Sequence, residues 1–214
     1  MSKISLKHSG GKVVSLNSPT TEPNANDVAF KLPNADGSAG QFMKTDGSGN
    51  LSFGAVSAGI TMADQWRITS SFNVAGSTPA YITSNWERND NPGYAKIGTG
   101  MSESSGEFSF PTTGIYLVGI NIVGYSNGGA FDYCSCYIHT TLDNSNYSMV
   151  AETFESVERN NQWFAMATET LFDVTDVSTH KVKFKTASNN TRPYVDGSSS
   201  SNQSFAHFTR LGDT

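Results

Sequence analysis

The sequence contains only two cysteines, Cys134 and Cys136, among its 214 residues. A disulfide framework therefore does not hold this fold together. The N-terminus also lacks the apolar stretch of a secretory signal peptide, and no apolar run approaches the roughly 20 residues that span a membrane. We expect a chain that is made in a cytoplasm and inserts into no membrane. It either stays in the cytoplasm or leaves the cell as part of a larger particle.

Charged residues are scarce as well. Asp, Glu, Lys and Arg make up 15% of the residues, and the formal net charge is −5. A nucleic-acid partner would require a basic stripe, so we expect no binding to nucleic acid. The 20 glycines, the 7 prolines and the frequent Ser, Thr and Asn residues favour short strands joined by turns over long helices.

Motifs of catalysis and metal binding are also missing. The sequence has no Gly-x-Ser-x-Gly elbow, no P-loop and no His-Glu-x-x-His pattern, and its four histidines lack the spacing of a metal site. Cys134 and Cys136 share one face of a strand, whereas His139 points to the other face. We therefore interpret the thiols as buried core residues and expect no zinc site.

Glu152, Glu155 and Glu158 are the candidates for a paired-carboxylate glycosidase site. Acidic residues in a polar segment are more often a solvated face, so we expect no enzymatic activity. The three acids repeat at helical spacing, but the residues between them are poor helix formers. We expect a loop or a single helical turn over residues 152–158.

The clearest positive feature is an apolar run over residues 115–125, which follows a turn at Pro111 and Gly114. Successive side chains of a strand point to opposite faces. This strand is apolar on both faces, whereas a strand with one solvated face alternates apolar and polar residues. One face therefore enters a core. The other requires a second cover, for which another copy of the chain is the simplest source.

Strand-like runs separated by turn residues fill the rest of residues 65–214, with no helical periodicity between them. This spacing predicts an antiparallel sandwich or jelly roll. In the run 181–185, Val182 and Phe184 alternate with lysines and are predicted to face the core. Strands are also predicted over residues 65–74, 80–86, 94–99, 107–110, 131–141, 147–150, 163–174 and 204–211.

Residues 1–58 differ in kind from the rest. Their short β-type runs, such as 28–32, 41–44 and 51–53, are separated by Gly, Ser, Asn, Asp and Pro. Elements this short are stable when they intertwine with other chains or lie on a partner, and a flexible linker is the alternative. We predict an attachment or intertwining segment at 1–58, a joint at 59–64 and a head domain at 65–214.

Four segments of the C-terminal part carry a family resemblance. They are the run from Gly106 to Tyr116 (Gly-Glu-Phe-Ser-Phe-Pro-Thr-Thr-Gly-Ile-Tyr), the strand 134–139, the segment 176–184 and the closing run 204–211 (Ser-Phe-Ala-His-Phe-Thr-Arg-Leu). With them, residues 65–213 resemble the globular head of complement component 1q, in the tumour-necrosis-factor-like jelly-roll superfamily. The resemblance implies an all-β, antiparallel jelly-roll β-sandwich that forms homotrimers. It also implies a set of trimer-interface residues: Tyr116, Val118, Ile120 and Ile122.

The N-terminal part carries a different resemblance, over about residues 28–54. The match is nearly continuous over 32–53, from Leu-Pro through Asp-Gly and Gly-Gln to Lys-Thr-Asp-Gly-Ser-Gly-Asn-Leu-Ser-Phe. This segment resembles the opening part of bacteriophage fibre proteins, especially those of marine phages. The long shaft of many fibres and a self-cleaving chaperone domain are missing, so the resemblance implies a short fibre or a decoration protein.

Ligand sites are less clearly marked. Tyr94, Tyr147 and Tyr194 are the candidates for sugar binding, because planar rings beside amides suit sugar recognition; packing in the core or at a trimer interface is the alternative for each ring. Heads of the resembling family can bind calcium, and the loops 89–91 and 143–146 offer oxygen ligands. We expect no cofactor, with calcium at these loops as the alternative.

Together these features predict a non-enzymatic bacteriophage virion structural protein, a short fibre or a capsid-decoration protein. Residues 1–58 would attach a homotrimer to capsid or tail proteins. The head would project from the virion surface, where it either binds a host-surface glycan through many weak contacts or only decorates the capsid. A polysaccharide-degrading fibre tip and a free ligand-binding head of the complement type are the alternatives.

Overall fold

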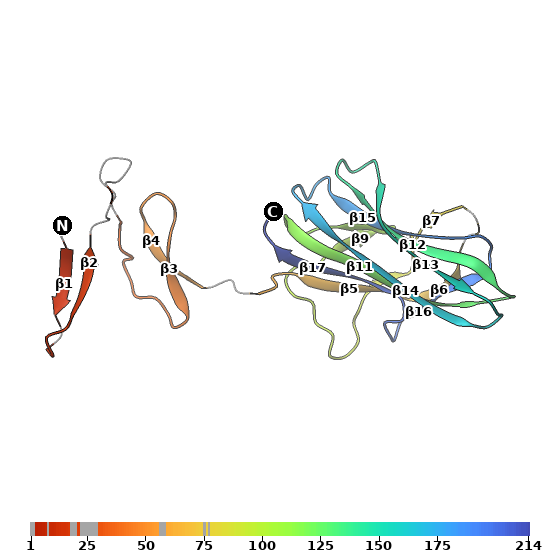
Figure 1. The fold of residues 1–214 in the computed structure, drawn as a ribbon, viewed down its shortest axis with the longest axis horizontal. Coiled ribbons are helices and arrows are strands. Elements are labelled where there is room, and N and C mark those ends of the chain that lie inside the picture. The colour runs from red at the N-terminus through yellow and green to blue at the C-terminus, as the bar shows by residue number, and fades with distance from the viewer. Residues whose placement is uncertain are drawn as a thin grey trace. The chain divides into compact units, whose positions relative to one another are not determined.

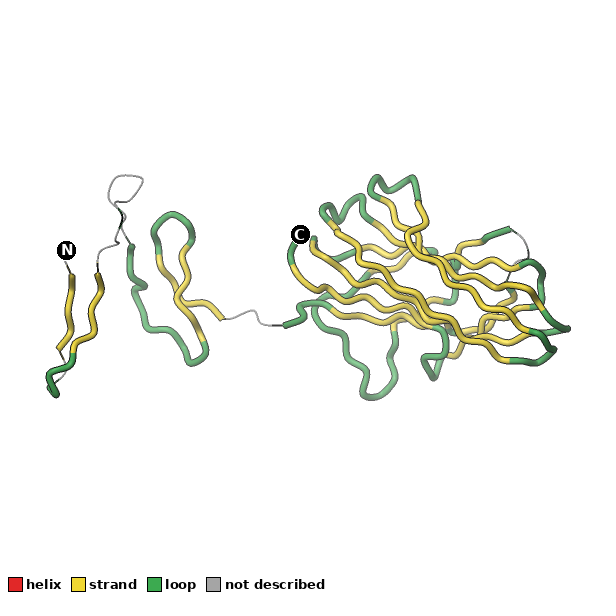
Figure 2. Tube along the Cα trace, in the orientation of Figure 1, coloured by secondary structure: helices red, strands yellow, loops and turns green. Residues whose placement is uncertain are grey.

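The computed structural model describes residues 3–7, 9–17, 21, 30–55, 59–74, 76 and 78–214. The regular elements in these ranges are all strands, and Figure 2 shows no helix among them. The chain divides into two compact units, Met1–Ala58 and Gly59–Thr214. The all-β class that the composition predicts is confirmed.

The N-terminal unit consists of two antiparallel hairpins. β1 (Lys3–Lys7) pairs with β2 (Val13–Asn17), and β3 (Gln41–Thr45) pairs with β4 (Leu51–Ala55). All five residues of β3 are exposed, so no side chain of this strand is buried within the second hairpin. The strand predicted at 28–32 falls partly outside the described residues.

The turn of the second hairpin, between β3 and β4, is held by Asp46. Its carboxylate accepts hydrogen bonds from the side-chain amide of Asn50 (2.5 Å) and from the backbone N–H of Ser48 (2.8 Å). These bonds stabilise the charged form and hold the pKa of Asp46 below its usual value. The Asp side chain thus replaces the backbone partners that the turn leaves unpaired.

The C-terminal unit, the head, is an antiparallel jelly-roll sandwich of two sheets (Figure 1). Its strands are β5 (Ala63–Ile68), β6 (Ser70–Asn73), β7 (Ala80–Tyr81), β8 (Trp86–Arg88), β9 (Ser102–Ser104), β10 (Glu107–Ser109), β11 (Gly114–Ser126), β12 (Phe131–Thr141), β13 (Ser148–Val157), β14 (Trp163–Val174), β15 (Lys181–Ser188), β16 (Pro193–Ser198) and β17 (Phe205–Gly212).

The two sheets are named after their longest central strands. The β12 sheet has the order β13-β12-β15-β10-β9, with β7 beside β15. The β11 sheet has the order β6-β16-β11-β17-β5-β8, with β14 on the other edge of β11. Strand β11 pairs with β14 over its whole length, from Gly114 opposite Val174 to Tyr125 opposite Trp163. Strand β11 also pairs with β16 and β17, so it is an interior strand of its sheet.

The core lies between the sheets and is built around an aromatic cluster. The ring of Phe108 lies 5.1 Å from those of Phe208 and Trp86 and 5.6 Å from that of Phe184. The prediction that Val182 and Phe184 face inward is confirmed, since both are fully buried. These residues come from both sheets, so the cluster joins them.

Residues 152–158, predicted as a loop or helical turn, extend β13 as far as Val157, so that prediction was wrong. Their backbone pairs with β12, where Thr153 lies opposite Cys136. The ladder hydrogen bonds outweigh the weak helical spacing of the acids. Strand β16 was not predicted. It begins at Pro193, and proline is uncommon in strands because it has no backbone N–H to donate.

Residues 94–99, predicted as a strand, form only an isolated bridge between Ala63 and Ile97. Gly98 explains the interruption. It has a φ of 68°, and a Cβ at this position would meet the carbonyl oxygen of Thr61 at 2.5 Å. The chain turns here in a conformation that favours glycine, so the strand does not continue.

We expect Phe108→Ala to lower the free energy of unfolding by about 3–5 kcal/mol, because the lost ring leaves a cavity in the core. Urea denaturation monitored by tryptophan fluorescence measures this change. Leu142→Ala is the control; its side chain is 63% exposed, so we expect a change within about 0.5 kcal/mol. Equal effects of the two substitutions would contradict the central place of Phe108.

Candidate functional site

Strands β14, β11, β17 and β5 lie side by side in the head (Figure 1). We call the side of β14, β11 and β17 that points away from the β12 sheet the outer face of the β11 sheet. Its residues are Ile115, Leu117, Gly119, Asn121, Val123 and Tyr125 on β11, Trp163, Ala165, Ala167, Glu169, Leu171 and Asp173 on β14, and Phe205, His207, Thr209 and Leu211 on β17.

This outer face is largely apolar and solvent-exposed. Trp163 is 61% exposed, Leu171 64% and Leu211 54%. Leu117 lies opposite Leu171 on one side and Thr209 on the other, so large apolar side chains meet across the strands. A sheet face that carries several large exposed apolar side chains marks an interaction site more often than a solvated face.

A glycine near the middle of the outer face leaves room for a histidine ring. Gly119 lies between Glu169 and His207 in the register, and a Cβ at Gly119 would meet the His207 ring at 2.3 Å. The imidazole therefore lies over the glycine. Burial lowers the pKa of His207, while Glu169, whose carboxylate lies 4.0 Å away, opposes the shift in part. Burial thus favours the uncharged imidazole.

The predicted trimer-interface residues do not lie on this face. Tyr116, Val118, Ile120 and Ile122 are at most 1% exposed, and their side chains pack between the two sheets of the same chain. Residues at every second position of β11 share a face, so these four belong to the interior set. That assignment is corrected: the face of β11 left for a partner carries Leu117 and its alternating neighbours.

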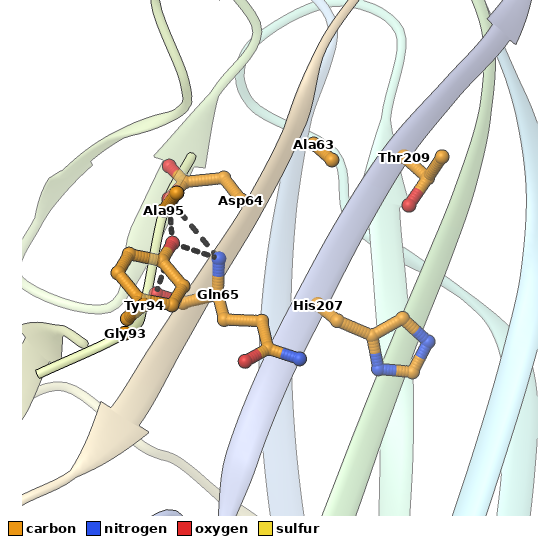
Figure 3. A pocket seen from close by; sticks show the side chains of 8 residues that line it. All are labelled: Ala63, Asp64, Gln65, Gly93, Tyr94, Ala95, His207 and Thr209. Atoms are coloured by element: carbon orange, nitrogen blue, oxygen red, sulfur yellow. Dashed lines mark hydrogen bonds between the residues drawn. The ribbon is translucent and has the colours of Figure 1, made fainter. Parts of the chain in front are cut away.

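Tyr94, a predicted sugar-binding residue, lines a hollow beside β5 and β17 (Figure 3). Its hydroxyl donates a hydrogen bond to Asp64 (2.9 Å) and accepts one from the backbone N–H of Gln65 (2.9 Å). Burial raises the pKa of Tyr94 to about 12. His207 and Thr209 line the other side of the hollow.

Asp64 anchors this region, and the sequence analysis did not single it out. Its buried carboxylate accepts hydrogen bonds from the indole N–H of Trp66 (3.0 Å), the backbone N–H of Met101 (2.8 Å) and Nε of Arg88 (3.1 Å). With Tyr94 these donors satisfy the carboxylate. Tyr94 is thus part of a structural network, and no local sequence signal marks the long-range partners.

Tyr147 and Tyr194 lie elsewhere. The Tyr147 hydroxyl donates to Glu107 (2.7 Å), and burial together with this carboxylate raises the pKa of Tyr147. Lys183 lies 4.4 Å above its ring. The Tyr194 ring stacks on Tyr125 at 5.4 Å. Each predicted tyrosine contacts a different set of residues, so the structure does not assemble them into one site.

The acidic residues and the cysteines form no catalytic or metal arrangement. Glu152 and Glu155 are three positions apart on β13, so their side chains point to opposite faces. Cys134 and Cys136 are buried free thiols, and burial raises the pKa of Cys134 to about 12. No group of three or more metal-ligating His, Cys, Asp or Glu residues occurs in the part of the chain that the structure describes.

The loop 89–91, a predicted calcium site, already surrounds a cation. The guanidinium of the buried Arg67 donates hydrogen bonds to the side-chain oxygens of Asn89 (3.3 Å), Asp90 (2.5 Å) and Asn91 (2.9 Å). It also pairs with Glu87 at 2.7 Å. Calcium at this loop stays a prediction, and the ion would have to displace the guanidinium.

The second predicted calcium loop, 143–146, is also closed internally. The Asp143 carboxylate accepts hydrogen bonds from the backbone N–H of Asn146 (2.7 Å), the side-chain amide of Asn146 (2.6 Å) and the hydroxyl of Thr141 (2.9 Å). These bonds lower the pKa of Asp143 far below its usual value. Calcium binding here likewise stays a prediction.

Solved structures share the fold of the head. Eiger TNF from S. frugiperda aligns with a TM-score of 0.55 and 14% identity, over 73% of this chain and 96% of that chain. Murine APRIL at pH 5.0 aligns with a TM-score of 0.52 and 10% identity, over 70% of this chain and 98% of that chain. At these identities the likeness shows a TNF-like jelly-roll fold and nothing of the function.

PRD1 vertex protein P5 aligns with a TM-score of 0.43 and 13% identity, over 72% of this chain and 100% of that chain; a likeness at that level carries no argument. No protein-family model matches the chain, and no curated protein matches it. The resemblance of residues 28–54 to phage fibres stays a prediction. Among the described residues, no helix has the length and apolar character needed to cross a membrane.

We expect Asp64→Ala to lower the free energy of unfolding by roughly 3 kcal/mol, because several buried donors lose their acceptor. The change is measured as a lower midpoint of urea denaturation. Asp173→Ala is the control. The side chain of Asp173 is exposed on β14, and its carboxylate makes no hydrogen bond or ion pair within the described chain. Equal midpoints for the two variants would show that the Asp64 carboxylate does not stabilise the region around Tyr94.

Proposed function

We propose that this protein is a non-enzymatic virion structural protein, a short bacteriophage fibre or capsid-decoration protein that displays a homotrimeric jelly-roll head. The observation that carries the proposal is the exposed apolar outer face of the β11 sheet. Trp163, Leu171 and Leu211 are large apolar residues that are more than half exposed on this one sheet face, and such a group is seldom left in water. The face therefore requires a partner.

The partner proposed for this face is the same face of two further copies of the chain. Ala165 and Ala167 on β14 are small and exposed, so a neighbouring sheet can approach closely there. Around these small residues lie larger apolar ones such as Leu117, which supply area for burial. Closed, symmetric assemblies are the usual form of homo-oligomers, and the TNF-like fold of the head supports this arrangement.

The N-terminal unit is proposed to attach the trimer to capsid or tail proteins. Phe30 is 61% exposed, Leu32 75%, Phe42 44% and Met43 49%. A hairpin with such residues in water is marginal by itself. Cover by the other copies and by the particle would bury them, which supports an attachment role for residues 1–58.

On a particle surface the head would contact the host cell, and the proposed ligand class is a host-surface glycan. Each head would contribute a weak contact, and the number of trimers on one particle would multiply the overall affinity. A depolymerase is not favoured, since Glu152 and Glu155 do not share a face.

We expect Leu117→Asp to give folded monomers, because a carboxylate at this partly buried position would be taken out of water at the interface. Analytical ultracentrifugation measures the mass, and near-UV circular dichroism reports the fold. Ile120→Asp is the contrast: its side chain is 1% exposed within one chain, so this variant should unfold instead. A Leu117→Asp protein that remains trimeric would overturn the proposed interface.

Deleting residues 1–58 should leave a folded head that is absent from purified particles. The two compact units support this expectation, since the head has a core of its own. Particles from cells that produce the truncated or the full-length protein are compared by mass spectrometry. Incorporation of the truncated protein at the full-length level would exclude attachment through this segment.

A further inference from the structure

A second surface of the head lies on the β12 sheet, on the side facing away from the core. Five residues line a hollow of about 360 Å³ there: Tyr133, Ser135 and Tyr137 from β12, and Glu152 and Phe154 from β13. We call this hollow the aromatic hollow. The proposed trimer interface and the predicted sugar-binding tyrosines lie outside it, and of its residues only Glu152 was considered above, as a glycosidase acid.

The strand pairing fixes the geometry of the aromatic hollow. Tyr133, Ser135 and Tyr137 occupy alternate positions, so their side chains emerge on one face of β12. Ser135 lies directly opposite Phe154, and Tyr137 lies opposite Glu152. Cross-strand neighbours of this kind are held by the ladder itself, so rings and polar groups are placed before a ligand arrives.

The two outer rings are unusually free. Phe154 is 70% exposed and Tyr133 is 36% exposed. Neither ring stacks on another aromatic ring in the described part of the chain, in contrast to the packed rings of the core. Burying the apolar surface of an exposed phenylalanine ring lowers the free energy. Binding of a ligand that covers the Phe154 ring is therefore favoured.

Polar groups lie between the rings. Ser135 is 3% exposed and lines the hollow, and the side chain of Tyr137 interacts with both Ser135 and Glu152. Glu152 itself is exposed and supplies carboxylate oxygens that accept hydrogen bonds from hydroxyl groups. The hollow thus offers aromatic faces together with acceptors.

We propose that the aromatic hollow binds a neutral saccharide. The apolar C–H face of a sugar ring would cover Phe154 and Tyr133, and its hydroxyl groups would donate to Glu152. A purely apolar partner would remove water from this exposed carboxylate without replacing it by a donor, and an acidic sugar would be repelled by the carboxylate. The nearby cation, Lys185, lies 4.8 Å above the ring of Tyr81 and does not line the hollow.

The size and shape of the hollow agree with this ligand class. Its volume of about 360 Å³ is near the lower end of the range for small-molecule sites. A shallow site on rigid strands suits weak binding of one or two sugar rings. The inference deepens the proposed function, since it names the residues and the sugar class by which a displayed head would hold a host glycan.

The experiment uses the full-length protein on a glycan array that carries neutral and acidic oligosaccharides, followed by titration calorimetry with the strongest neutral binder. We expect binding to neutral sugars. Phe154→Ala and Tyr133→Ala should each raise Kd roughly ten-fold or more, a loss comparable to one good contact. Leu142→Ala, an exposed apolar residue away from the hollow, should leave Kd unchanged.

Three outcomes would overturn the inference. They are no binding to any sugar on the array, binding of acidic sugars alone, and neutral-sugar binding that survives Phe154→Ala. Self-association that Phe154→Ala abolishes, in a protein that binds no sugar, would assign the hollow to a protein contact instead.

The monomeric Leu117→Asp variant separates this inference from the proposed assembly. The aromatic hollow lies within one chain, so the monomer should bind the free sugar with unchanged Kd. A trimer that binds no sugar would sink the inference alone. A sugar-binding protein that is never trimeric would sink the assembly alone.

Discussion

Strand β11 is enclosed on one face by the β12 sheet and is bare on the other. Because successive side chains alternate, the backbone that buries Tyr116 and Ile120 in the core also places Leu117 on the outer face. A one-residue slip against β14 or β17 would exchange these two sets and expose the core. Core packing therefore fixes which positions of β11 form the outer face, and a substitution at one of them, such as Leu117→Asp, changes that face without changing the core.

The same alternation explains both the success and the error of the sequence reading. The apolar run at 115–125 predicted the strand, its central place and the need for a second cover. The two alternating sets look equally apolar, however, and the choice between them depends on which side the β12 sheet covers. That contact joins segments far apart in the chain, such as Phe108 and Phe208, and no local pattern encodes it. The set containing Tyr116 was therefore assigned to the wrong face.

The loops show a related limit. Composition marked the loops 89–91 and 143–146 and the residue Tyr94 as ligand sites, because they carry carboxylates, amides and rings. In the folded chain these groups have internal partners: Arg67 lies within the first loop, and Asp64 accepts from Tyr94. Groups with such partners hold a loop in place, and binding a ligand would require breaking those bonds. Sequence shows the type of a polar group and not whether it is already satisfied.

The groups left without such partners lie on strands instead. On the β11 sheet they are large apolar side chains such as Leu171 and Leu211, which suit another protein surface. On the β12 sheet they are the rings of Tyr133 and Phe154 beside Glu152, which suits a small polar ligand. Strand pairing fixes the backbone beneath both sets without a ligand, so only side-chain rotamers have to be ordered on binding. In this fold the rigid sheet faces, and not the loops, carry the surfaces still able to form contacts.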